Sequence, residues 1–201
     1  MEYISCAPRL LTAYTQYVII SASSNSKWRA FMEILRREIY CIPAPELAPL
    51  LLGKFLCRRT DNGKTLRLRI TETEAYFGEE DTACHANHGR TPRTETLYLP
   101  GGYAYVYLCY GIHSLLNVVS GSEGHPEAVL IRGVEGFRGP GRLTKALNIT
   151  RAQNAKLLVP ENGLWLEDDK TPVPEYLTYP RVGIDYAAED DRVRHWRFMI
   201  K

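Results

Sequence analysis

Hydrophobic and polar positions alternate along residues 66–76, which read LRLRITETEAY. Side chains of one parity share one face of a strand. The even positions begin with three aliphatic residues and then continue into Glu72, Glu74 and Tyr76. A carboxylate on a buried face is destabilising unless a partner compensates for its charge, and a β-bulge would reverse the parity. The pattern predicts a strand with an unusual pair of carboxylates on its core face.

The neighbouring patterns predict several more strands and few helices. The turn signal Asp61-Asn62-Gly63 separates two apolar runs and predicts a β-hairpin. Residues 103–120 predict two strands around a turn near Tyr110 to His113. Further strands are expected at EAVLIRGVE, NGLWL and RHWRFMI, a helix from about Pro45 with Leu47, Leu50 and Leu51 on one face and a stop at Gly53, and a short helix in GPGRLTKALNI. Because hairpins join successive strands, an antiparallel or mixed sheet is expected.

Composition bounds the class of protein. The chain has 201 residues, of which 45% are hydrophobic and 24% charged, as in ordinary globular proteins. No apolar run approaches the 18 residues of a membrane span. Five cysteines without a CxxC pair predict reduced thiols and a cytoplasmic-type compartment, or a nuclear one in a eukaryote. Residues 1–30 lack periodicity and are expected to be a poorly ordered extension of a domain at residues 31–201.

Charge is distributed unevenly although the net charge is only +2. Six basic residues and one acidic residue fall between Arg132 and Lys156, a balance of 6 − 1 = +5. Within this segment, GPGRLTK places two glycines before a helix that carries Arg142 and Lys145. Free backbone N–H groups and basic side chains favour an anion, so this turn, which includes Gly141, predicts a phosphate contact.

Three groups of residues could carry chemistry. Glu72 and Glu74 are either a solvated strand end paired with arginines or a general base whose pKa is raised by burial. Tyr103, Tyr105, Tyr107 and Tyr110 fall within eight residues and form either a tyrosine-rich sheet or a surface for stacking nucleobases. CHANH contains Cys84, His85 and His88, but no second cluster supplies the remaining ligands of a zinc site, so a pocket histidine is favoured over a metal.

Several motifs occur in one order and together resemble a known family. These motifs are LLGKFL, RITETEAYFGEEDTACHA, GRTPR, YAYVYLCYGIHSLLNVV, AVLIRGVE and GPGRLTKALNI. The chain resembles the 3-methyladenine (alkyladenine) DNA glycosylases over about residues 39–201. The resemblance implies a single α+β domain with a curved, mostly antiparallel, partly open barrel-like sheet, a few packed helices and a protruding hairpin that bears a tyrosine. It also implies a monomer that acts on damaged purines in double-stranded DNA without a cofactor or metal.

The resemblance assigns roles to individual residues. Glu74 matches the glutamate that deprotonates the attacking water, and Arg132 matches an arginine that helps to hold this water. The walls of the base pocket match Tyr76, His85 and Tyr107, and its floor matches Asn117, which excludes the amine of guanine. Tyr110 matches the side chain inserted into the duplex, with Ile112 beside it. The expected DNA contacts also include Arg93, Gly141, Arg142 and Lys145. Glu72 belongs to the same motif as Glu74 and is expected to have only a supporting role.

Other classes of function stay open at this point. A non-catalytic DNA-binding module would keep the basic segment and Tyr110 without needing Glu74. A metal hydrolase would use Glu74, His85 and His88, and bound zinc would favour it. A sugar-cleaving glycosidase with the Glu72/Glu74 pair is disfavoured, because carboxylates on one strand face point the same way rather than flanking a bond.

Overall fold

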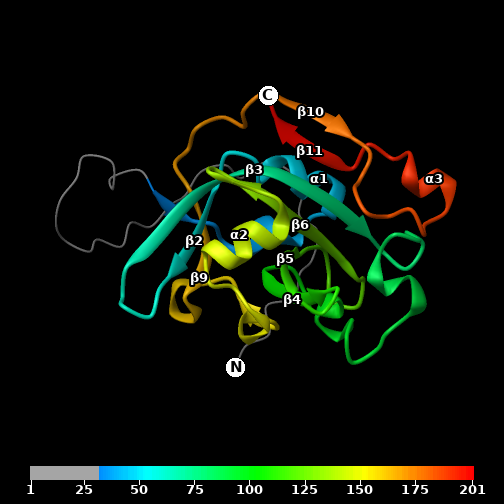
Figure 1. Ribbon diagram of the computed structural model, residues 1–201, viewed down its shortest axis with the longest axis horizontal. Coiled ribbons are helices and arrows are strands. Elements are labelled where there is room, and N and C mark those ends of the chain that lie inside the picture. Colours follow the sequence, from blue (N-terminus) through cyan, green and yellow to red (C-terminus); the bar gives the residue numbers. More distant parts are fainter. Residues whose placement is uncertain (1–31) are drawn as a thin grey trace.

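A strongly curved sheet dominates the computed structural model, which describes residues 32–201, so the predicted extension at residues 1–30 lies outside the described part (Figure 1). All pairings among the eleven described strands are antiparallel, in the order β1-β9-β2-β3-β6-β5-β4-β8, with β11 beside β3, β10 beside β11 and β7 beside β6. The strands are β1 Glu33–Ile34, β2 Phe55–Arg59, β3 Thr65–Phe77, β4 Tyr103–Cys109, β5 His113–Val119, β6 Glu127–Val134, β7 Phe137–Arg138, β8 Lys156–Leu157, β9 Leu164–Asp168, β10 Tyr176–Tyr179 and β11 Arg197–Ile200. The fold is a single α+β domain with a partly closed sheet, as the resemblance implied.

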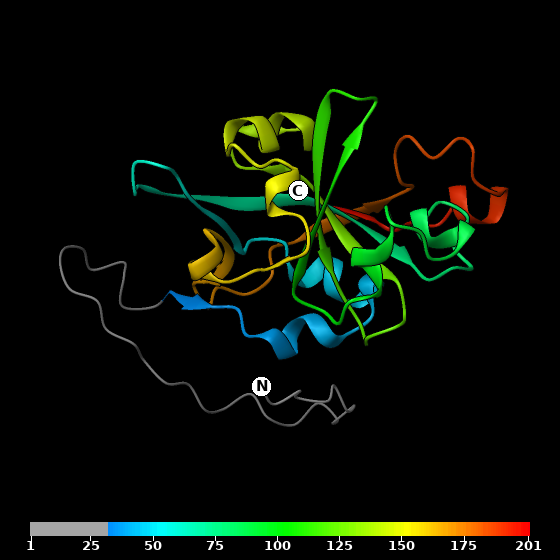
Figure 2. The same ribbon diagram turned by 90° about the horizontal axis from the view of Figure 1, so that it is seen from below.

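Three short α-helices accompany the sheet in the described residues: α1 Ala44–Leu50, α2 Pro140–Ala146 and α3 Glu189–Arg192. Five 3-10 turns span Arg37–Cys41, His85–His88, Glu95–Tyr98, Arg151–Gln153 and Pro160–Asn162. In Figure 2, α1 lies on one side of the sheet, whereas α2 and the tip of the β4–β5 hairpin lie on the other. None of the described helices is long and apolar enough to cross a membrane.

A β-bulge in β3 answers the question that its sequence raised. Ile70 packs in the main hydrophobic core of the domain, together with Leu47 and Leu56. The pairing of β3 with β6 then shifts register between Ile70 and Thr73. Beyond the shift, the odd positions face α1, because Thr73 donates a hydrogen bond to the carbonyl of Ala48 and Ala75 joins the main core. The bulge therefore turns Glu74 away from this core and toward the opposite face of the sheet.

Helix α1 covers the main core but not with the predicted face. Leu47, Leu51 and Leu52 are buried, whereas Leu50 is 39% exposed, so its predicted place on the buried face is wrong. The helix spans only seven residues, and the chain beyond it turns inward at Leu52 before Gly53. Gly53 has a φ of +81°, which a residue with a side chain rarely adopts, and it ends the helix as expected.

The four cysteines within residues 32–201 divide into two groups. Cys57, Cys84 and Cys109 are free thiols, as predicted. Cys41 is disulfide-bonded, so the expectation of reduced thiols throughout is wrong for this residue.

Candidate active site

One row of side chains crosses the face of the sheet opposite α1. Strand register places Asn117 of β5 opposite Tyr105 of β4 on one side and Leu130 of β6 on the other. Leu130 in turn lies opposite Glu74 of β3. Because paired residues on neighbouring strands share a face, the sheet brings Glu74 beside the residues that line a cavity of about 520 Å³.

Glu74 is the carboxylate at the end of this row, and its side chain is fully buried. Its Oε1 accepts a hydrogen bond of 2.9 Å from the backbone N–H of Val182, and its Oε2 accepts one of 2.9 Å from the Tyr76 hydroxyl. Burial raises the pKa of Glu74 above its ordinary 4.5, against the opposing effects of Arg132 and these two hydrogen bonds. The site therefore holds a carboxylate that is more basic than usual.

Arg132 stands between the two glutamates of β3. Its Nε lies 3.0 Å from Oε1 of Glu72, and its Nη1 lies 3.4 Å from Oε1 of Glu74. Glu72 also pairs with Arg197 at 3.2 Å. The guanidinium is thus shared, and Glu74 receives the longer contact, so its charge is only partly compensated.

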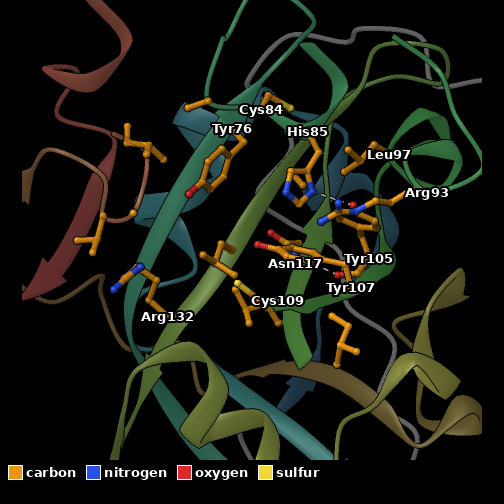
Figure 3. A pocket seen from close by; sticks show the side chains of 18 of the residues that line it. Tyr76, Cys84, His85, Arg93, Leu97, Tyr105, Tyr107, Cys109, Asn117 and Arg132 are labelled. Atoms are coloured by element: carbon orange, nitrogen blue, oxygen red, sulfur yellow. Dashed lines mark hydrogen bonds between the residues drawn. The ribbon is translucent and has the colours of Figure 1, made fainter. Parts of the chain in front are cut away.

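The cavity has aromatic walls from two parts of the sheet (Figure 3). Tyr76 approaches from β3, and Tyr105 and Tyr107 approach from β4. The rings of His85 and Tyr107 lie 4.4 Å apart at 72°, and Nδ1 of His85 lies 2.9 Å from the Tyr105 hydroxyl. Burial, with a smaller effect from Arg93, lowers the pKa of His85 to about 4, so its imidazole is neutral at pH 7.

The floor of the cavity contains Asn117, which is 4% exposed. Its amide nitrogen donates a hydrogen bond of 3.1 Å to the backbone carbonyl of Tyr105. This bond fixes the plane of the amide, so the cavity floor is rigid and polar.

The tip of the β4–β5 hairpin presents two large side chains to solvent. Tyr110 is 90% exposed and Ile112 is 73% exposed. Tyr110 has a φ of +49° and the next residue, Gly111, a φ of +73°. Tyrosine is unfavourable in this left-handed region, so neither burial nor backbone preference accounts for Tyr110 in the turn.

The predicted DNA contacts occupy two places. Arg93 lines the cavity, with its guanidinium 5.5 Å from the Tyr107 ring centroid. Arg142 and Lys145 are exposed on α2, beside the hairpin (Figure 2). A Cβ at Gly141 would lie 3.1 Å from the His113 ring, so this glycine permits close packing of α2 on β5.

The histidine cluster does not gather metal ligands. His85 lines the cavity, whereas His88 is exposed and lies outside its lining. Within residues 32–201, no group of three or more His, Cys, Asp or Glu side chains is placed to hold a metal ion.

Sequence reasoning missed the part of the site that comes from residues 181–186. Val182 binds Glu74 through its backbone, and Tyr186 lines the cavity while its hydroxyl donates to the carbonyl of Ala83. Arg181 is buried under Tyr76, 4.9 Å from its ring centroid, and pairs with the buried Asp81. The sequence offered one signal: between Leu157 and Asp191, nine acidic residues accompany only two basic ones, Lys170 and Arg181.

Comparison with known proteins agrees with this geometry. The sequence model of the family described as Methylpurine-DNA glycosylase (MPG) matches residues 38–139 and 135–201. A protein of Arabidopsis thaliana named DNA-3-methyladenine glycosylase is 41% identical over 204 residues, which cover 92% of this chain and 76% of the plant protein. A protein of Psychrobacter cryohalolentis, provisionally named a 3-methyladenine DNA glycosylase, is 44% identical over 185 residues, covering 78% of this chain and 87% of its own.

Proposed function

Because this chain belongs to the methylpurine-DNA glycosylase family, we propose that it excises alkylated or deaminated purines from duplex DNA. Its substrates are bases of the 3-methyladenine, hypoxanthine and ethenoadenine class, and the bond it hydrolyses is the N-glycosidic bond. The observation that carries the proposal is Glu74, a fully buried and incompletely paired carboxylate at the edge of an aromatic cavity.

The cavity suits a purine that has left the base stack. An enzyme that acts on a base in duplex DNA has to flip it out, at a cost of a few kcal/mol that is smallest for damaged bases. Tyr76 and Tyr107 offer rings on which the flipped base stacks, and such stacking contributes about 1–3 kcal/mol per base. Asn117, held by its bond to Tyr105, excludes the exocyclic amine of guanine from the floor.

Glu74 supplies the base for the hydrolysis. Its carboxylate takes a proton from a water molecule while the water oxygen attacks C1′ of the deoxyribose. The bond from C1′ to N9 breaks, and its electron pair leaves with the purine. Arg132, which contacts both Glu72 and Glu74, orients the water and its surroundings. The raised pKa of Glu74, caused by burial, strengthens it as a general base near neutral pH.

The hairpin and α2 hold the DNA around this site. Tyr110 enters the duplex in place of the flipped base, with Ile112 beside it, which explains why both are exposed. Arg142 and Lys145, carried on α2 next to Gly141, contact phosphates on the same side of the sheet as the hairpin tip (Figure 2). Phosphate contacts position the duplex without reading its sequence.

The test is single-turnover release of base from a duplex that carries one hypoxanthine or one 3-methyladenine, in the presence of a chelator. Wild type is expected to release base, and Glu74→Gln is expected to be slower by roughly 10²–10⁴-fold, the usual contribution of a general base. Glu72→Gln is the matched control, and its loss is expected to be far smaller. Binding of both duplexes by wild type without release would instead identify a non-catalytic DNA-binding module.

A further inference from the structure

Two apolar side chains are exposed at the mouth of the base cavity, on residues 181–186, which we call the rim segment. Val182 and Tyr186 both line the cavity, yet Val182 is 47% exposed and Tyr186 is 68% exposed. Single exposed apolar residues are common on protein surfaces. These two line the same cavity, where a bound substrate would cover them and they would gain the free energy of burial.

The rim segment is fixed to the rest of the domain at both of its ends. The side chain of Arg181 has no exposed surface and pairs with Asp81. The hydroxyl of Tyr186 donates a hydrogen bond of 3.0 Å to the backbone carbonyl of Ala83, and Ile184 is buried against the same loop. Because the segment is held in place before a substrate arrives, contact with its side chains costs little ordering entropy.

The position of Val182 beside Glu74 identifies the part of the substrate that meets the rim segment. The backbone N–H of Val182 donates a hydrogen bond of 2.9 Å to Oε1 of Glu74. In the proposed reaction, the water activated by Glu74 attacks C1′ while the base lies deeper in the cavity, against Tyr76 and Tyr107. The deoxyribose therefore has to lie at the mouth, next to both Glu74 and Val182.

The charge near the rim segment favours the sugar over a phosphate as its contact. Residues 185–190 include three acidic side chains, those of Asp185, Glu189 and Asp190, and no basic one. All three are exposed, and none forms an ion pair within residues 32–201. Like charges repel a phosphate, whereas the basic residues Arg142 and Lys145 lie on α2, beside the hairpin.

We propose that Val182 and Tyr186 form an apolar seat for the deoxyribose of the flipped nucleotide and hold its C1′ toward Glu74. The inference rests on the proposed function and adds to it a contact with the sugar. The two side chains act by position, because a reacting atom that is displaced from its attacking group loses much of the rate.

The test uses a duplex that carries one tetrahydrofuran abasic analogue, which is a sugar without a base. Its affinity relative to an undamaged duplex is measured for wild type, Tyr186→Ala, Val182→Ala and Val193→Ala. Val193 is the matched control, because it is an exposed valine that does not line the cavity. Tyr186→Ala is expected to weaken this relative affinity by roughly 10-fold, Val182→Ala by a smaller factor, and Val193→Ala not at all.

Three further readouts separate a sugar contact from other roles. Tyr186→Phe keeps the ring and is expected to restore most of the affinity, and the salt slope of binding should stay unchanged in every variant, since no phosphate contact is lost. Single-turnover release of hypoxanthine at saturating enzyme should be slower in Tyr186→Ala than in Val193→Ala. A lower salt slope in Tyr186→Ala would make the contact a phosphate, and a loss confined to the hypoxanthine duplex would make it the base. Either result overturns the inference.

Failure of this inference is distinguishable from failure of the proposed function. Wild type that releases no hypoxanthine would refute the proposed function. Wild type that releases hypoxanthine, together with unchanged relative affinity for the abasic duplex in both Tyr186→Ala and Val182→Ala, would overturn the sugar seat alone.

Discussion

Glu74 and Asp81 are both fully buried carboxylates, but their surroundings differ. Asp81 forms two hydrogen bonds to Arg181, at 2.5 and 2.8 Å, and accepts two more from the backbone N–H groups of Phe77 and Ala83. Glu74 accepts bonds from Val182 and Tyr76, and its closest guanidinium is 3.4 Å away and shared with Glu72.

The difference is the one expected between a structural carboxylate and a reactive one. A buried charge is tolerated when a cation and hydrogen bonds satisfy it, which describes Asp81. Glu74 has neutral donors and a distant, divided cation, and burial raises its pKa. Buried carboxylates whose charge is incompletely compensated are typical of active sites. There the loss of protein stability is tolerated because the group is needed for the reaction. We therefore expect Glu74 to limit activity and Asp81 to limit stability.

The largest expected effect is on the rate of the Glu74→Gln variant, which we expect to fall by roughly 10²–10⁴-fold. Its fold should be retained, because glutamine keeps the shape of the side chain and still accepts a hydrogen bond from Val182. Single-turnover base release measures the rate, and circular dichroism checks the fold. Activity close to that of wild type would remove Glu74 from the chemistry.

The reciprocal change is Asp81→Asn, which leaves Arg181 charged in a site where neither side chain has exposed surface. Breaking a buried pair in this way costs about 3–5 kcal/mol of stability. Urea denaturation of wild type and variant gives the difference. A loss below about 1 kcal/mol, comparable to that of an exposed ion pair, would contradict the distinction between the two carboxylates.

Stability should also depend on pH through Glu74. Because its pKa in the folded state is raised above 4.5, the folded protein binds this proton more tightly than the unfolded chain. The stabilisation is complete below about pH 4.5 and is lost as pH rises through the raised pKa. Relative to Glu74→Gln, wild type should therefore become less stable as pH increases from 4.5 toward neutrality. If the free energy of unfolding of the two proteins changed with pH in the same way, this result would refute the raised pKa of Glu74.

The smallest expected effect comes from Glu72→Gln, which releases Arg132 from one of its two glutamate partners. Arg132 then compensates Glu74 more fully, so the pKa of Glu74 should fall. The acid side of the pH–rate profile should shift to lower pH, with a loss of rate below roughly 10-fold. A shift to higher pH would show that Glu72 does not compete for Arg132.

Local sequence patterns predicted most strands of the fold but not the β-bulge in β3. The hairpins β2–β3 and β4–β5 follow from turn residues and alternation, which act over a few neighbouring positions. The bulge after Ile70 adds one residue to the pattern and has no distinctive side chain, so alternation alone left open which face Glu74 occupies. Leu50 was misplaced because α1 is short and the chain leaves it at once.

The candidate site divides in the same way. Glu74, Tyr76, His85, Tyr107 and Asn117 belong to motifs that the sequence displays directly, and the structure gathers them around one cavity or at its edge. Arg181 and Asp81 are 100 residues apart in the chain. Their pairing depends on the fold as a whole, and nothing in the local pattern of either segment indicates it.

The most direct test of the difference between the two carboxylates is the pH dependence of single-turnover release of 3-methyladenine by wild type and Glu74→Gln. This base needs no acid to leave, so the acid limb of the profile reports on the general base. We expect wild type to lose activity below an apparent pKa that lies above 4.5, and the residual rate of Glu74→Gln to lack this limb. A wild-type rate that stays constant down to pH 4.5, or the same limb in both proteins, would contradict Glu74 as the buried, basic catalyst.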